Sequence, residues 1–410
     1  MDDSFPPARL RIGAGGSTNV TAESAADHAA DICMERLEGE APALLIAFAS
    51  AAHAPAFQTI CARLRERTGA RAFLGAVGSG AMAGRGALES GFALSTLGIA
   101  CEGAETRVAS GTSPTDVLDE ATSLSARRLT LCFATRDVAA IDDALAADRA
   151  EHAAIIGGLM EPAAGQRATL VGGETPVTSG LVAASLAGDF LFDASVAQGC
   201  EPFGPVCVVT QAQGDQLFEL SGESAINVLQ RAREELDEPH RLALNAGVFI
   251  GRSVAAHKSH HGRADFVLSR VMRSNRDLGA LSLSEPVRVG QTVRFHLRTP
   301  NAAVNDLTML LGMQKLRGPA RAVLMFSDSG RGEALHGQSA FEIGLVGRTL
   351  SPPEAGEELA KAGRKIDPAS RFPLPIAGAF GFAPIGPVGD HAAVHSQATV
   401  LGVFRDSVAD

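Results

Sequence analysis

A unit of strand, helix, strand, glycine-rich hairpin and closing strand recurs three times along the 410 residues of this chain. We place the copies at 42–98, 127–188 and 321–404. In the first copy the strand ALLIAFAS precedes a helix whose apolar residues have the i, i+3, i+4, i+7 spacing of one helix face: Phe57, Ile60, Cys61 and Leu64. Strands and one-sided helices must each bury an apolar face. The repeat therefore predicts sheets covered by helices.

The second and third copies follow the same order. In the second, LTLCFAT leads through a helix to AAIIGGLM and the closing strand LVAASLAG; in the third, AVLMFSDSGRG leads to FPLPIAGAFGFAPIGPVGD and ATVLGVF. We predict an α/β fold in an α+β layered form, with two related lobes of mixed β-sheet covered by helices. The predicted division is an N-terminal segment at 1–20, a first lobe at 21–220 and a second at 221–410.

Other patterns fill the intervals between the copies. We expect helices at 21–37, at 221–236 with Ser221 as the cap, and at 301–316. Alternating apolar residues predict a hairpin with one buried face at 280–298. The charged, proline-flanked stretch at 354–365 is typical of a solvated insertion.

Composition excludes several classes of function. Hydrophobic residues make up 46% of the chain and charged ones 20%, which is enough for a full core without disulfides. The net charge of −10 argues against a nucleic-acid or anionic-membrane surface. The start MDDSFPPARL lacks the features of a signal peptide, and the longest uncharged stretch, 43–62, contains His53 and Pro55. We therefore expect a cytoplasmic protein whose six scattered cysteines stay reduced.

The stretch VAQGCEPFGPVCVVT at 196–210 concentrates glycines, prolines and cysteines between apolar runs. Gly199 and Gly204 supply unusual backbone angles, prolines fix φ, and 206–209 reads as a buried strand. Such a rigid turn is either a structural corner or a loop that holds a small ligand against backbone amides.

Three further motifs are weaker candidates. GAGGSTN at 13–19 could cradle phosphate, but no apolar strand precedes it and no Gly-Lys-Ser/Thr follows. In HKSHHG, His257, His260 and His261 have metal-ligand spacing, but a glycine follows at once, and we expect no metal. SDSGRG at 327–332 ends a buried strand without the Gly-x-Ser-x-Gly pattern of a nucleophile. There Arg331 can fork onto a ligand carboxylate or cap backbone carbonyls.

These residues carry a resemblance to the FIST proteins. QGCEPFGPVCVVT resembles the signature that ends the N-terminal half of that family, and VGSGAMAGRGALESGFALS is similar to its first glycine loop. LSGESAINVL, FVLSRV with LGALSLSEPVRVGQTVRFHLR, and AVLMFSDSGRG with the stretch to His395 are similar to the remainder. The resemblance implies a sensory module that binds a small molecule, with amino acids or their metabolites the usual proposal and no established catalysis.

The sequence departs from the family pattern at polar positions. Glu201 stands where Arg is usual, Asp328 and Ser329 stand where Cys-Asn is usual, and 381–384 replaces Cys-Ala-Gly-Glu. The expected ligand-binding residues are Gly199, Cys200, Glu201, Gly204, Asp328, Gly330, Arg331 and His395.

We expect no cofactor, and partners limited to a small-molecule ligand and to a separate signalling protein or a second copy. Two alternatives are a hydrolase or amidase that uses Cys200 and a scaffold whose pocket no longer binds a ligand.

Overall fold

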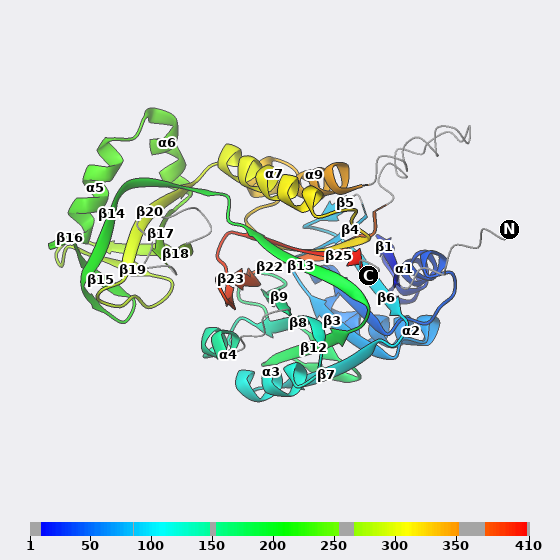
Figure 1. Cartoon of the computed structure of the whole chain (residues 1–410). Coiled ribbons are helices and arrows are strands. Elements are labelled where there is room, and N and C mark those ends of the chain that lie inside the picture. The colour runs from blue at the N-terminus through cyan, green and yellow to red at the C-terminus, as the bar shows by residue number, and fades with distance from the viewer. Residues whose placement is uncertain (1–9, 85, 148–152, 254–265, 352–373, 408–410) are drawn as a thin grey trace. The chain divides into compact units, whose positions relative to one another are not determined.

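The computed structural model describes residues 10–84, 86–147, 153–253, 266–351 and 374–407. The chain forms two compact units, one made of 1–196 with 309–410 and the other of 197–308. Figure 1 shows their elements. The arrangement of mixed sheets covered by helices that the sequence predicts is confirmed. The predicted lobe boundary at 220/221 differs from the division into these units, because the smaller unit interrupts the larger one rather than following it.

All three predicted repeats are present in the larger unit, and each begins with one more strand and helix than the pattern indicated. The first contains β1(Leu10–Ser17), α1(Ala22–Arg36), β2(Leu44–Ala49), the 3-10 helix η1(Ala51–Ala56), α2(Phe57–Thr68), β3(Ala72–Val77), β4(Gly80–Ala83), β5(Gly86–Leu88) and β6(Leu94–Cys101). The second contains β7(Glu105–Gly111), α3(Pro114–Thr122), β8(Arg127–Thr135), α4(Ile141–Ala147), β9(Ala154–Met160), β10(Leu170–Gly172), β11(Thr175–Val177) and β12(Leu181–Ala187). The third contains β13(Phe190–Ala197), α7(Pro300–Leu316), β21(Ala322–Asp328), α8(Glu333–His336), α9(Phe341–Leu350), β22(Ile376–Gly381), β23(Ala383–Val388), β24(His391–Val394) and β25(Thr399–Asp406).

The hairpin of each repeat leaves its own sheet and completes the sheet of another. The sheet orders are β1-β6-β2-β3-β10-β11, β7-β12-β8-β9-β23-β24 and β13-β25-β21-β22-β4-β5. The second repeat thus supplies the hairpin of the first sheet, the third that of the second, and the first that of the third. This cyclic exchange gives the unit a pseudo-threefold arrangement.

Each sheet is buried on both faces, which explains why its central strands are apolar throughout. The helices α1 and α2 cover the outer face of the first sheet, and α3 and α4 cover that of the second. The inner faces share one core, at whose centre three phenylalanines from equivalent strand positions meet. The ring centroids of Phe48, Phe133 and Phe326 are 5.4 to 5.6 Å apart. In Figure 1, α1 with α2, α3 with α4, and α9 lie on three different sides of these sheets.

The smaller unit is a barrel inserted into the third repeat between β13 and α7. It contains β14(Cys200–Gln213), β15(Gln216–Leu220), β16(Glu223–Ser224), α5(Ala225–Glu234), α6(Glu238–Ala243), the 3-10 helix η2(Leu244–Ala246), β17(Val248–Ser253), β18(Phe266–Asn275), β19(Ala280–Leu283) and β20(Thr292–Arg298). The sheet runs β14-β20-β17-β18-β19-β15-β16, and a pairing of β14 with β15 closes it. In the first two repeats the equivalent connections, at 18–21 and 112–113, are short.

Several local predictions were wrong. The hairpin at 280–298 does not form, because β19 pairs with β18 and β15 while β20 pairs with β14 and β17. The stretch 206–209 lies within the bulged strand β14, and its Val206 and Val208 are exposed rather than buried. The helix expected to be capped by Ser221 begins at Ala225 after Ser224.

The GAGGSTN motif does not form a glycine-rich turn ahead of α1. Residues 13–17 lie in strand β1, and only residues 18 and 19 lie in the turn that follows it. The glycines of β1 let helix α1 pack closely against this strand. The insertion at 354–365 and the HKSHHG motif lie outside the described residues. Across the part of the chain that the structure describes, no helix combines the length and hydrophobicity needed to cross a membrane.

Candidate functional site

The ends of β3, β9 and β22, one strand from each repeat, meet at one point of the larger unit. Gly78, Met160 and Gly381 hold equivalent positions there, and the Met160 side chain fills the space beside both glycines. A Cβ atom built on Gly78 would lie 3.1 Å from Met160 Cε, and one built on Gly381 would lie 3.4 Å from Met160 Sδ. The strand ends of all three repeats therefore surround the buried Met160.

A pocket of about 340 Å³ opens at these strand ends. It is lined by residues that follow β8, by the end of β9 and by the loop that leads to β10: Thr135, Arg136, Asp137, Met160, Glu161, Gly165, Gln166, Arg167 and Ala168. Because β8 and β9 are parallel, their carboxyl ends lie at the same edge of the sheet, where α/β proteins commonly bind ligands. This pocket is the candidate site.

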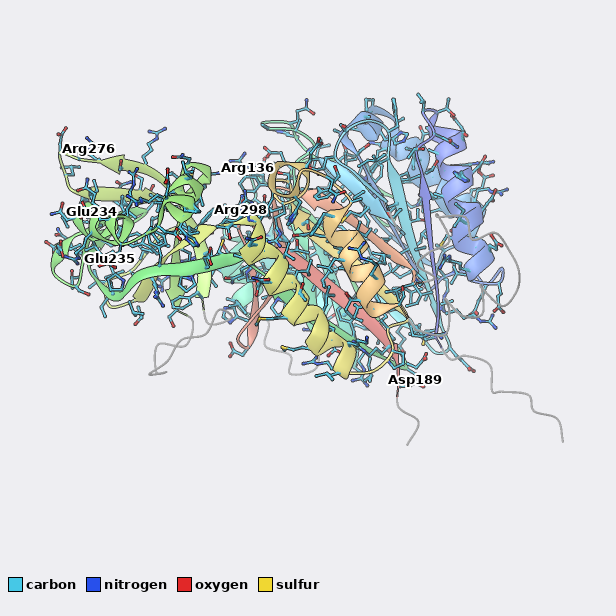
Figure 2. All side chains as sticks on the ribbon, turned by 90° about the horizontal axis from the view of Figure 1, so that it is seen from above. Arg136, Asp189, Glu234, Glu235, Arg276 and Arg298 are labelled. Atoms are coloured by element: carbon cyan, nitrogen blue, oxygen red, sulfur yellow. The ribbon has the colours of Figure 1, made fainter. Side chains whose placement is uncertain are left out.

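One wall of the pocket is built around Arg136, which is labelled in Figure 2. Its guanidinium carbon lies 4.0 Å from the ring centroid of Phe382, which comes from the third repeat. Arg136 Nη1 donates to Glu161 Oε1 at 3.0 Å, and the Gly165 amide donates to the same oxygen at 2.9 Å. Glu161 thus joins the arginine to the loop at 161–168. Sequence reasoning noted Phe382 only as part of a family departure.

The pocket also has an acid and a base that are more open to solvent. A hydrogen bond from Thr135 holds the pKa of Asp137 below its usual value, and Ser179 Oγ adds a second hydrogen bond at 3.1 Å. The carboxylate therefore stays ionised. Arg167 is exposed and, among the residues that the structure describes, has no hydrogen bond or ion pair. Its charge nevertheless helps to stabilise the Asp137 carboxylate.

Sequence reasoning placed expected ligand-binding residues at the equivalent strand end of the third repeat, where Asp328 corresponds to Thr135. The structure buries Asp328 and directs its carboxylate at the backbone. Oδ1 accepts from the Gly330 amide at 2.8 Å, and Oδ2 accepts from the Gln397 amide at 3.0 Å. Asp328 and Gly330 therefore lie together in one hydrogen-bonded turn. Their role in ligand binding stays a prediction.

The Arg331 side chain has no exposed surface, and its guanidinium binds a carboxylate of the chain itself. Its Nε and Nη2 donate to Glu342 Oε1 at 3.1 and 2.6 Å, and its Nη1 donates to the Gln397 carbonyl at 3.1 Å. Of the two roles that the sequence left open, this geometry is that of a structural arginine. Glu342, on α9, occupies the position expected for a ligand carboxylate.

Glu342 has three further polar neighbours. His336 Nε2 lies 3.0 Å from Oε1, Thr399 Oγ1 donates to Oε2 at 2.6 Å, and Ser327 Oγ donates to Oε2 at 3.4 Å. Burial raises the pKa of Glu342, but the Arg331 charge and these hydrogen bonds outweigh it and lower the pKa to about 2. Both His336 and Ser327 bond to the Glu342 carboxylate rather than to each other. The histidine is therefore not placed as a base for the serine hydroxyl.

The remaining predicted residue of this unit, His395, is fully enclosed. Its Nε2 lies 3.2 Å from the Gly386 carbonyl, and burial lowers its pKa to about 4. His395 is therefore neutral at physiological pH, without the positive charge that would attract an anion.

Gly199, Cys200, Glu201 and Gly204 all belong to the barrel unit. Gly199 and Gly204 have φ angles of 64° and 62°, and a bulge between Phe203 and Val206 bends β14. The Gly199 amide donates to Asp306, and Glu201 Oε1 accepts from Thr299 Oγ1 at 3.1 Å and lies 3.3 Å from His240 Nε2. The predicted residues are thus divided between the two units.

Cys200 lies in a small hydrophobic cluster with Phe249 and Leu268 and is 3% exposed. We expect native protein to react with iodoacetamide at Cys200 far more slowly than free cysteine does, because the reagent cannot reach the sulfur. Peptide mass spectrometry after timed labelling measures the rate. The same protein in denaturant is the control, and rapid native labelling would favour the cysteine hydrolase.

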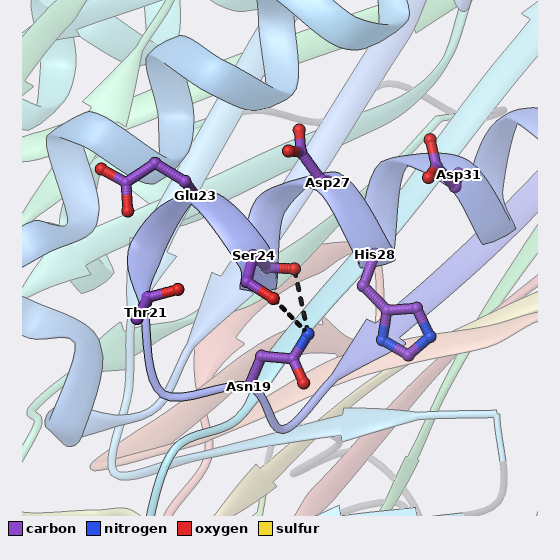
Figure 3. Close-up of a pocket in the computed structure, with 7 residues that line it drawn as sticks. All are labelled: Asn19, Thr21, Glu23, Ser24, Asp27, His28 and Asp31. Atoms are coloured by element: carbon purple, nitrogen blue, oxygen red, sulfur yellow. Dashed lines mark hydrogen bonds between the residues drawn. The ribbon is translucent and has the colours of Figure 1, made fainter.

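A second hollow, of about 660 Å³, runs along α1 (Figure 3). The acids Glu23, Asp27 and Asp31 lie on one side of the helix, and Asn19, Ser24 and His28 lie on the other. Asp27 and Asp31 already form ion pairs with Arg63 and Arg67 on α2. Across the described ranges, histidines, cysteines and acids do not cluster into a metal site. We therefore favour the strand-end pocket over this open helix face.

Comparison with known proteins decides the family. The FIST N domain model matches residues 43–223, and the FIST C domain model matches residues 225–356. The chain belongs to the FIST family. The domains of this family are sensory, ligand-binding modules. The two matches meet close to the predicted lobe boundary, whereas the barrel unit begins within the first of them.

The relatives span the whole chain. An uncharacterized protein of Mycobacterium tuberculosis (strain H37Rv), Rv0628c, is 27% identical over 406 residues, with 97% of this chain and all of the relative covered. Mb0898c, an uncharacterized protein of Mycobacterium bovis, is 27% identical over 429 residues with the same coverage. A crystal structure of a cyanuric acid hydrolase from A. caulinodans aligns with 98% of this chain and all of its own at a TM-score of 0.31 and 9% identity. That likeness is too low to carry an argument.

The residues of the strand-end pocket were missed by sequence reasoning. A signal was present, because Thr135, Arg136 and Asp137 lie at the end of β8 just as Asp328 lies at the end of β21. Applying the strand-end argument to every repeat would have found them.

Proposed function

We propose that this protein is a cytoplasmic sensor that binds a small zwitterion, such as an amino acid or a related metabolite, in the pocket at the ends of β8 and β9. The observation that carries the proposal is that ionised Asp137 and exposed Arg167 line one pocket. An ammonium group can pair with Asp137, and the two oxygens of a carboxylate can pair with Arg167 and Arg136. The sensory character of the family supports the same function.

The signal passes to a separate protein or to a second copy, by a population shift between free and bound states. We propose no catalysis, no cofactor, and no binding to nucleic acid or membrane. The cysteine hydrolase and the scaffold that binds nothing are the alternatives.

Arg167→Ala should weaken the binding of the ligand at least tenfold, because a hydrogen bond to a charged group contributes about 1.5 to 3 kcal/mol. The melting temperature of the free protein should stay unchanged, since the side chain is exposed. Thermal shift with the twenty common amino acids, followed by calorimetric titration, measures both quantities. Native mass spectrometry of protein from its own host would add the mass of any retained compound.

Arg71→Ala is the matched control, since Arg71 is another exposed arginine of the same unit and lies outside the pocket. If no amino acid or metabolite binds wild type, the scaffold alternative is favoured. Equal loss of binding in both variants would place the ligand elsewhere.

A further inference from the structure

Glu161 is the charged group of the candidate pocket that contacts both Arg136 and the neighbouring loop. One oxygen, Oε1, accepts hydrogen bonds from Arg136 and from the Gly165 amide, and the side chain is only 12% exposed. The bond to Gly165 closes the loop at 161–168 on itself. A single carboxylate therefore both neutralises an arginine of the pocket and fixes the loop beside it.

Arg136 has a second contact that does not involve Glu161. The guanidinium of Arg136 lies over the ring of Phe382, and the Phe382 amide donates to the Leu159 carbonyl at 2.8 Å. The aromatic surface keeps the arginine in place whether or not Glu161 is bound. A second carboxylate that approaches Arg136 can therefore take the place of Glu161 while the guanidinium keeps its contact with the Phe382 ring.

We infer that Glu161 is an internal competitor for the ligand, an inference that rests on the proposed function. The carboxylate of the ligand replaces Glu161 on Arg136, and the displaced Glu161 then releases the Gly165 amide. No bond is made or broken other than hydrogen bonds and ion pairs. Binding thereby converts the closed form of loop 161–168 into an open form.

The loop connects the pocket to a different sheet. Residue 168 is followed by β10, whose Leu170 is paired with Ala76 of β3, and the Val77 amide donates to the Thr169 carbonyl at 3.0 Å. The hairpin β10–β11 belongs to the first sheet. Release of loop 161–168, which precedes this hairpin in the second repeat, therefore changes how the hairpin is held at the edge of the first sheet. The exchanged hairpin gives the sensor a path from the ligand to a surface of another repeat.

Glu161→Gln tests the inference. Glutamine keeps the shape of the side chain and an oxygen for Gly165, but it loses the charge that competes for Arg136. Amino-acid binding should tighten roughly fivefold, as expected when a partly exposed ion pair no longer has to be broken. Alaninamide, which has no carboxylate, should bind both proteins equally. In wild type, amino-acid binding should speed hydrogen exchange at 165–177.

Glu174→Gln is the matched control, because Glu174 lies in the hairpin β10–β11 that follows loop 161–168, is 88% exposed and pairs with Arg65 rather than Arg136. It should leave the affinity unchanged. If amino acids bind wild type but Glu161→Gln binds them no more tightly, or exchange at 165–177 does not respond, the competitor role is wrong while the sensor stands. If neither protein binds any of the twenty amino acids, both proposals fall.

Discussion

Replacing Glu342 with alanine should lower the free energy of unfolding by about 3 to 5 kcal/mol, as expected when one partner of a buried ion pair is removed. Arg331 has no exposed surface, and two of its nitrogens bind Glu342 Oε1. The substitution leaves the buried cation without that carboxylate. Urea denaturation followed by circular dichroism measures the loss.

Glu333→Ala is the control for this prediction, because Glu333 is an exposed glutamate on the neighbouring helix α8. Acetate or formate should restore part of the stability of Glu342→Ala, since a small carboxylate fits the vacated position, and chloride at equal ionic strength should not. If the two alanine variants unfold at the same urea concentration, the ion pair contributes little.

The same carboxylate gives stability a defined pH dependence. Its pKa in the folded protein is about 2, below the ordinary value of 4.5, so the contribution is present above 4.5 and is lost as the pH falls toward 2. Wild type should therefore lose more stability across this window than Glu342→Gln. Parallel slopes for the two proteins would contradict the assignment.

Gly15→Ala should destabilise the protein by about 3 kcal/mol, the upper part of the usual range for overpacking a core. A Cβ atom at this position of β1 would lie 1.9 Å from the carbonyl oxygen of Ala29 in α1. Because the obstacle is backbone, a change of rotamer cannot relieve it and the helix itself must move. Thermal and urea denaturation measure the effect.

Gly86→Ala provides the comparison, since a Cβ atom added there would have no atom within 4 Å and the strand is at a sheet edge. We expect its stability to stay close to that of wild type. Equal stability of the two variants would show that α1 adjusts its distance from β1 at little cost.

The sequence predicted the repeats because each is defined by local periodicity. Apolar runs, helical spacing and glycine turns indicate where a strand begins and ends, and all three units were found at the expected positions. Strand partners are different, since pairing depends on residues far away in the chain. The same cause explains the wrong hairpin at 280–298, where β19 and β20 both pair with other strands.

The ligand-binding residues that the sequence predicted show the same limit. The glycines around Arg331 indicated an arginine that binds a ligand carboxylate or caps backbone carbonyls, and in the structure it binds the carboxylate of Glu342 and the Gln397 carbonyl. No local pattern marks Glu342, which looks like one charge on an amphipathic helix. Truncating Arg331 to alanine should therefore lower the melting temperature of the free protein, whereas a ligand clamp would leave it unchanged.

The exchanged hairpins also set an order for folding during synthesis. The hairpin β4–β5 is made early, but its partner strand β22 begins at Ile376, near the end of the chain. The sheet of the second repeat likewise waits for β23. No third of this unit can complete its own sheet, so apolar strand edges of the second and third sheets stay open until β22 and β23 have been made. A ribosome stalled before β22 would hold a chain with two incomplete sheets, and such a chain is a natural target for chaperones and a source of aggregation.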